Sequence, residues 1–146
     1  MYLFSTGNGT KYFYVSDLKT WIEAQDNCRR SDSILAEPKS PAEYEDIKKL
    51  IWNSIYNYGS GLIQPGQWIG ATYQTKDGQW VWFDSNQPVG SDGYNHSLET
   101  KQPGNEKKNC LGLKFRMLGP KNSVGLASKL IEYKCQNKFP SICEKN

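Results

Sequence analysis

The feature that most constrains how this chain can fold is its set of four cysteines, spread through 146 residues. They are Cys28, Cys110, Cys135 and Cys143. None belongs to a C-x-x-C pair, the spacing typical of zinc sites and thioredoxin-like redox motifs. An even number of widely spaced cysteines favours two disulfides, and four cysteines allow three pairings that sequence alone does not separate. The sequence therefore predicts a disulfide-stapled fold with its pairing still open.

Two N-glycosylation sequons accompany the cysteines, Asn8-Gly9-Thr10 and Asn95-His96-Ser97. Because disulfides persist in oxidising compartments, the two features together indicate a secreted, extracellular protein. The opening Met1-Tyr2-Leu3-Phe4 is too short for the apolar core of a signal peptide. No later apolar run is long enough to span a membrane. We therefore expect a mature or trimmed secreted chain without membrane insertion.

Chain length and charge indicate the number of domains and the kind of partner. A chain of 146 residues suits one domain, spanning residues 1–146, whose five Trp, nine Tyr and five Phe can bury large areas. The net charge is +3, and its 18 basic and 15 acidic residues are interleaved along the whole length. This pattern lacks the basic block of a nucleic-acid-binding arm, so no nucleic-acid partner is predicted.

Two helices are predicted in the first half of the chain. A strand at Lys11–Val15, aromatic and β-branched, comes before them. Thr20-Trp21-Ile22-Glu23 has the form of a capping box, and Ser40-Pro41-Ala42-Glu43 repeats it with proline at the first helical position. The second helix should bury Ile47, Leu50, Ile51 and Ile55 and end at Gly59-Ser60-Gly61.

The second half favours strands. Gln67–Tyr73 and Gln79–Phe83 should pair as a hairpin across the turn at Thr75–Gly78. Further strands are predicted at Cys110–Phe115 and Phe139–Cys143. Between Asp84 and Asn109 lies a long polar stretch, and long loops inside compact domains are usually functional. This order predicts an α+β fold, with two helices packed on short antiparallel sheets and one long loop region.

Five short motifs follow one another along the chain. They are Trp21-Ile22-Glu23-Ala24 leading to Cys28, Trp68-Ile69-Gly70-Ala71, Gly78-Gln79-Trp80-Val81-Trp82, Gln102-Pro103-Gly104 and Ile142-Cys143-Glu144. In this order they resemble the C-type lectin-like superfamily from about Lys11 to Glu144, and its single-domain secreted arthropod members in particular. The resemblance implies the C-type lectin-like fold and the disulfides Cys28–Cys143 and Cys110–Cys135.

The resemblance also implies a degraded calcium site. Calcium-dependent members hold the ion with an EPN or QPD motif, a carboxylate two residues before a cysteine, and a WND motif. Calcium needs six to eight oxygen ligands. At the matching positions this chain has Gln102, Gly104, Lys108 and Leu130-Ile131-Glu132, so few oxygen ligands remain. We therefore expect no cofactor. The alternative is a weak, rearranged calcium site through Gln102, Glu106, Asn109 and Glu132.

Candidate ligand-binding residues follow from the same resemblance and, for Tyr94 and His96, from their place in the long polar stretch. The candidates are Gln102, Asn105, Glu106, Asn109, Tyr94, His96 and Glu132. Gln102 fits the galactose-type motif, and Tyr94 with His96 could stack on a sugar face. The alternative is that these side chains only form a solvated loop surface. Alternation in the strand at Gln79–Phe83 predicts that Trp80 and Trp82 pack in the core.

These residues favour recognition over catalysis. With a single histidine and paired cysteines, the sequence offers neither a histidine metal cluster nor a free thiolate, so no enzyme is predicted. The leading hypothesis is a lectin that binds a carbohydrate or glycoprotein surface, with an innate-immune role implied by resemblance alone. The competing hypothesis is a protein-binding domain without sugar binding, partnered by a second lectin-like subunit.

Overall fold

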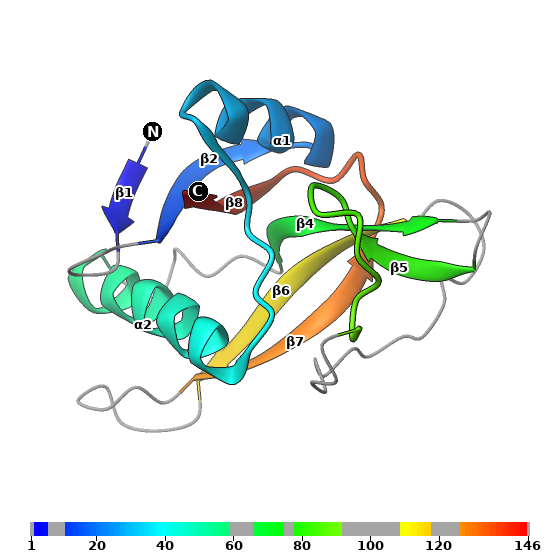
Figure 1. Cartoon of the computed structure of the whole chain (residues 1–146). Helices are drawn as coiled ribbons and strands as arrows, with labels where there is room; N and C mark the ends of the chain where they lie inside the picture. Colours follow the sequence, from blue (N-terminus) through cyan, green and yellow to red (C-terminus); the bar gives the residue numbers. More distant parts are fainter. Residues whose placement is uncertain are drawn as a thin grey trace.

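The computed structural model describes residues 2–5, 11–58, 66–74, 78–91, 109–117 and 126–145, and the statements below concern these residues. They form two helices and eight strands (Figure 1). The elements are β1 (Tyr2–Ser5), β2 (Tyr12–Lys19), α1 (Trp21–Arg30), β3 (Ser33–Leu35), α2 (Pro41–Tyr58), β4 (Gln67–Gln74), β5 (Gln79–Trp82), β6 (Cys110–Met117), β7 (Leu126–Tyr133) and β8 (Phe139–Lys145).

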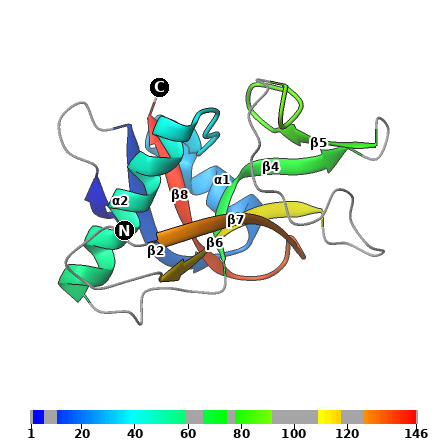
Figure 2. The same cartoon turned by 90° about the horizontal axis from the view of Figure 1, so that it is seen from below.

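The strands join into one sheet with the order β1-β2-β8-β4-β6-β7, while β3 pairs with β8 and β5 pairs with β4. The predicted hairpin is confirmed, with Tyr73 opposite Trp80. The predicted α+β fold is also confirmed, although one pairing in the sheet is parallel where antiparallel sheets were predicted. There β4 and β8 run parallel, with Trp68 beside Ser141, because β8 returns from the far end of the chain to the middle of the sheet. Figure 2 shows the β4–β5 hairpin on the opposite side of the molecule from α2.

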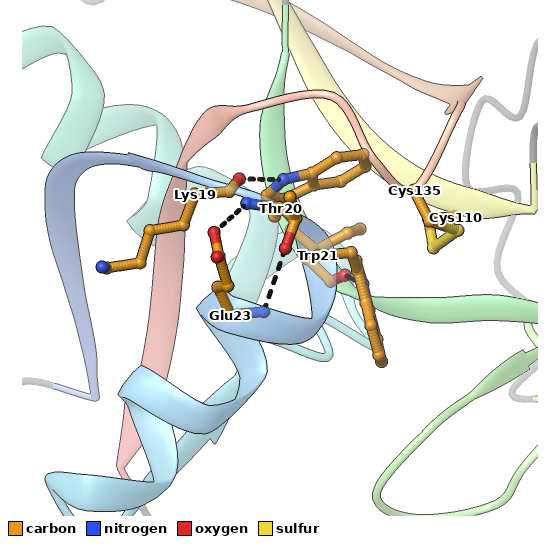
Figure 3. Close-up of a disulfide and its surroundings, with 8 residues drawn as sticks. Lys19, Thr20, Trp21, Glu23, Cys110 and Cys135 are labelled. Atoms are coloured by element: carbon orange, nitrogen blue, oxygen red, sulfur yellow. Dashed lines mark hydrogen bonds between the residues drawn. A yellow bond between two sulfur atoms is a disulfide. The ribbon is translucent and has the colours of Figure 1, made fainter.

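Helix α1 begins with the predicted capping box. The Thr20 hydroxyl accepts from the Glu23 N–H at 3.3 Å, and the Glu23 carboxylate accepts from the Thr20 N–H at 3.0 Å (Figure 3). These bonds satisfy two N–H groups that no helical carbonyl can reach. The bond from the Thr20 N–H lowers the pKa of Glu23. The helix start therefore sets the face that carries Trp21 and Cys28 inward.

Helix α2 begins as predicted, but its cap differs from a closed box. The Ser40 hydroxyl accepts from the Glu43 N–H at 3.2 Å. The Glu43 carboxylate accepts instead from the N–H of Lys39, at 2.8 Å, one residue before the expected donor. Ile47 and Leu50 are fully buried, which confirms the predicted stripe there. The Ile55 side chain and the expected stop at Gly59–Gly61 lie outside the described residues.

The core consists of two clusters that the sheet separates. One contains Ile47, Leu50 and other residues of α2, and the second contains Trp21, Ala24 and Cys28 of α1. Both predicted disulfides, Cys28–Cys143 and Cys110–Cys135, are present. A helix therefore covers each side of the sheet, and the disulfides belong to the α1 side.

Hydrogen bonds from two tryptophans connect the start of α1 to β4 in the middle of the sheet. The indole N–H of Trp21 donates to the Ile69 carbonyl at 2.9 Å, and that of Trp68 donates to the Lys19 carbonyl at 2.8 Å. The Trp21 backbone N–H donates to the carbonyl of Cys135 at 3.0 Å, next to the second disulfide (Figure 3). The motifs around Trp21 and Trp68 are thus one structural unit that holds β4 in place.

Candidate ligand-binding site

The structure describes the first residues of the long polar stretch, where it leaves the β4–β5 hairpin. Residues 84–91 turn back along β5, where Val89 donates its N–H to the Trp80 carbonyl at 2.9 Å. The N–H of Trp82 likewise donates to the Gln87 carbonyl at 2.8 Å. Asn86 and Gly90 have φ of 58° and 94°, conformations that asparagine and glycine adopt most readily. The start of the predicted loop is therefore fixed to the sheet by main-chain bonds.

Six side chains from β4, β5, β6 and β7 lie on the same core face of the sheet, and Val89 of this segment packs against that core. Tyr73 on β4 is opposite Trp80 on β5, and their rings are 5.3 Å apart in an edge-to-face contact. On β6 and β7, Leu111 is opposite Glu132 and Leu113 is opposite Leu130. Because side chains two residues apart share a face, Glu132 lies on the core face that carries Leu130. It is also next to the point where the chain re-enters the sheet at Cys110.

Three buried polar atoms on this core face make no hydrogen bond with any described residue. They are Oε2 of Glu132, Nε1 of Trp80 and the hydroxyl oxygen of Tyr12. Leaving such an atom unpaired costs about 1–3 kcal/mol, so native structures seldom leave one without a partner. The burial of Trp80 and Trp82 confirms their predicted core position. The sequence did not predict that the indole N–H of Trp80 lacks a partner among the described residues, because its burial away from water depends on the tertiary structure.

Asn109 is placed at the end of the same segment. Its carbonyl accepts from the N–H of Tyr73 at 3.0 Å, and its side chain is half-buried. Asn109 and Glu132 are thus the two predicted site residues that the structure describes, and both lie where the polar stretch meets the sheet. The other predicted site residues and both sequons lie outside the described residues: Tyr94, His96, Gln102, Asn105, Glu106, Asn8 and Asn95.

The described residues do not fit a calcium ion. Leu130 is fully buried in the core, and Ile131 is half-buried on the other face of β7. Of this triplet, only Glu132 offers a side-chain oxygen. Within the described ranges there is no group of three or more His, Cys, Asp or Glu side chains that could hold a metal. One carboxylate is far from the six to eight oxygens that calcium needs.

Neither described helix is long and apolar enough to cross a membrane.

The chain matches the family model described as the lectin C-type domain over residues 17–145. It is 33% identical over 79 residues to salivary C-type lectin 2 of Aedes albopictus, covering 54% of this chain and 50% of that protein. The match thus spans half of that relative's length.

A second relative matches along the whole chain. The alpha-N-acetylgalactosamine-specific lectin of Patiria pectinifera is 27% identical over 149 aligned positions, covering 99% of this chain and 77% of that protein. Among solved structures, human lithostathine superposes with a TM-score of 0.66 at 22% identity, covering 92% of this chain and 82% of that one. That likeness shows a shared fold.

Proposed function

Because this chain belongs to the C-type lectin domain family, we propose that it recognises carbohydrate where the Asp84–Asn109 segment meets the Glu132 face of the sheet. The observation that carries the proposal is the Glu132 carboxylate. Its Oε2 is buried without a partner among the described residues, and Glu132 lies opposite Leu111, two residues after Asn109. A sugar hydroxyl can donate to such an oxygen, and hydrogen bonds to charged groups are stronger than neutral ones.

The sugar class that we propose is galactose-configured, with N-acetylgalactosamine as the first probe. Gln102 stands where the galactose-type motif of the family has its glutamine, and the relative from Patiria pectinifera is named for this sugar. Asn105 and Asn109 would add amide donors and acceptors, Glu106 a further carboxylate, and Tyr94 with His96 would cover an apolar sugar face. A single site of this kind should bind at around millimolar strength, ~4 kcal/mol, and act on surfaces through clustering.

Calcium should contribute little to this site. Lys108 brings a cation, and Ile131 brings an apolar side chain, to positions where calcium-dependent members of the family have oxygen ligands. The two disulfides support an extracellular, secreted location. We further propose that residues 1–146 act as one domain and that its targets are glycans on microbial or other foreign surfaces.

A glycan array probed in calcium and in EDTA tests the proposal. Wild type should bind galactose-configured glycans equally in both buffers. Glu132→Gln should weaken binding about tenfold or more, because a hydrogen bond to a carboxylate contributes about 1.5–3 kcal/mol. Glu45→Gln is a matched control, since Glu45 lies on α2 and pairs with Lys48. Equal binding by the two variants would place the site elsewhere.

A second candidate function is a protein-binding domain without sugar binding. The observation that favours it is Ile131, an apolar side chain at a position where calcium-dependent members of the family have an oxygen ligand. A chain that binds no glycan in either buffer, and that forms a dimer or captures a second lectin-like subunit in solution, would support this candidate instead.

A further inference from the structure

The first residues after β5 are held by a buried carboxylate from a distant part of the chain. Glu37 lies between β3 and α2, and the residue is 3% exposed. Its Oε2 accepts from the N–H of Asp84 at 2.7 Å and from the N–H of Ser85 at 3.4 Å. The Lys39 ammonium adds a second attachment by donating to the Ser85 hydroxyl at 2.9 Å. Three hydrogen bonds from the linker before α2 thus hold the first two residues of the Asp84–Asn109 segment.

Glu37 is itself fixed by a closed ring of charged residues. Its backbone N–H donates to Oε1 of Glu144 at 2.8 Å, and Oε2 of Glu144 is 3.5 Å from Nζ of Lys11. Lys11 also donates to Glu43, which accepts from the backbone N–H of Lys39 at 2.8 Å. Nζ of Lys39 closes the ring at 3.3 Å from Oε1 of Glu37. The ring joins the start of β2, the end of β8 and the first turn of α2.

A buried carboxylate is a costly way to hold a loop for stability alone. Replacing buried charged groups by apolar side chains of similar size is often neutral or stabilising. What a carboxylate adds is direction, because it accepts two main-chain N–H groups at defined positions. Glu37 therefore determines where Asp84 and Ser85 lie, and the bonds of Val89 and Gln87 to β5 determine the course of the chain beyond them.

We propose that Glu37 is a positioning residue for ligand binding, which acts by fixing the entry of the Asp84–Asn109 segment. This inference rests on the proposed function, because it assumes that this segment contacts the ligand. Glu37 itself does not contact the ligand. It acts through the main chain of Asp84 and Ser85, and Lys39 reinforces it through the Ser85 hydroxyl.

The test compares Glu37→Ala and Glu37→Gln with wild type in the full chain. Glu37→Ala removes both acceptors, whereas Glu37→Gln keeps one oxygen for the Asp84 N–H. Three quantities are measured: affinity for immobilised N-acetylgalactosamine, hydrogen exchange of the Asp84 and Ser85 amides, and the melting temperature. We expect Glu37→Ala to speed exchange at both amides and to weaken binding about tenfold or more, with Glu37→Gln in between.

Ile47→Val is the matched control, because it removes a buried methylene from α2 without touching the ring or the segment. It should lower the melting temperature and leave binding and both amides unchanged. Binding that follows only the melting temperature across the three variants would overturn the inference, as would normal exchange at Asp84 and Ser85 in Glu37→Ala. If Glu37→Ala does not fold, Glu37→Gln with binding and exchange equal to wild type overturns it.

The two proposals fail differently. A wild-type chain that binds no glycan overturns the proposed function, and the positioning role falls with it. A wild-type chain that binds, together with a Glu37→Ala variant that binds equally well, overturns the positioning role alone.

Discussion

The pKa values of two carboxylates of the charged ring shift in opposite directions, although both carboxylates contact Lys11. Burial raises the pKa of Glu144, and the bond from the Glu37 N–H and the charge of Lys11 only partly offset this effect. Glu43 is also partly buried, but the direct bond from Lys11 and the Lys39 N–H bring its pKa below the ordinary value. The difference arises because Glu144 is more deeply buried than Glu43 and lies farther from the Lys11 ammonium.

The raised pKa of Glu144 predicts a specific pH dependence of stability. A carboxyl whose pKa is raised by folding favours the folded state below its ordinary value of 4.5, and this contribution is lost as the pH rises through the raised pKa. Glu144→Gln keeps an acceptor for the Glu37 N–H but cannot ionise. Its free energy of unfolding relative to wild type should therefore increase from pH 4.5 toward neutrality and then level off. Urea titrations from pH 4 to 8 measure this difference, and a constant difference across the range would contradict it.

The N-terminal cap of α1 predicts that removing the Thr20 hydroxyl alone lowers the stability of the protein. Thr20→Ala removes the acceptor of the Glu23 N–H and should lower the free energy of unfolding by about 1 kcal/mol. For a chain of this length, such a loss corresponds to a fall of roughly 2–4 °C in the melting temperature. Thr20→Ser keeps the hydroxyl and should melt close to wild type. Equal losses in both variants would show that the cap bond is not the cause.

At the scale of elements, one glycine lets two segments approach closely. Gly70 on β4 donates its N–H to the Ala36 carbonyl at 2.9 Å and accepts from the N–H of Phe83 at 2.7 Å. A Cβ at Gly70 would lie 2.8 Å from the carbonyl oxygen of Leu35, closer than side chains approach main-chain atoms. The linker that carries Glu37 can therefore lie against β4 only when residue 70 has no side chain.

Gly70→Ala should destabilise the protein by about 1–3 kcal/mol, because the backbone near Leu35 has to move. Thr72→Ala, in the same strand and half-buried, is the comparison and should cost less. Chemical denaturation of both variants measures the difference. Since the shift would also displace Glu37, Gly70→Ala should speed exchange of the Asp84 amide, and an unchanged amide would argue against this coupling.

Sequence patterns predicted the elements whose signals are local. The cap residues Thr20 and Ser40 marked both helices, and the residues around Gly78 marked the β4–β5 turn. The strands β1, β3 and β7 were not predicted. β3 is only three residues long and exists through its pairing with β8, while Ser128 and Lys129 interrupt the apolar pattern of β7. Such strands are determined by their partners rather than by their own composition.

The site residues also fall into those that the sequence predicts and those that only the tertiary structure reveals. Resemblance to the lectin family pointed to Glu132 and Asn109. The structure places Asn109 at the end of the polar segment and Glu132 opposite Leu111, two residues further along. Glu37 was missed because Ala36-Glu37-Pro38-Lys39 reads as an ordinary polar linker, and nothing local shows that its carboxylate is buried. Burial of a single charged residue depends on chain segments 47 and 107 residues away.

At the scale of the whole molecule, the two disulfides constrain loops of very different size. Cys28–Cys143 joins residues 115 apart, and Cys110–Cys135 joins residues 25 apart. Chain-entropy arguments give stabilisation of roughly 4.8 and 3.5 kcal/mol for such loops. Replacing Cys28 and Cys143 by alanine should therefore cost more than replacing Cys110 and Cys135. Guanidinium denaturation of the two double variants checks the order, and a larger loss for the shorter loop would contradict it.

The response to calcium tests how the whole domain uses its binding face. A ligand present at a hundred times its dissociation constant stabilises a protein by about 2.7 kcal/mol, which would raise the melting temperature here by roughly 5–10 °C. Because Glu132 is the one side-chain oxygen at residues 130–132 and Lys108 opposes a cation, melts in millimolar calcium and in EDTA should differ by less than about 1 °C. Glu132→Gln, melted in both buffers, is the control. A rise of several degrees in wild type that disappears in this variant would show that Glu132 holds a calcium ion, and sugar recognition would then have to be tested again as a calcium-dependent process.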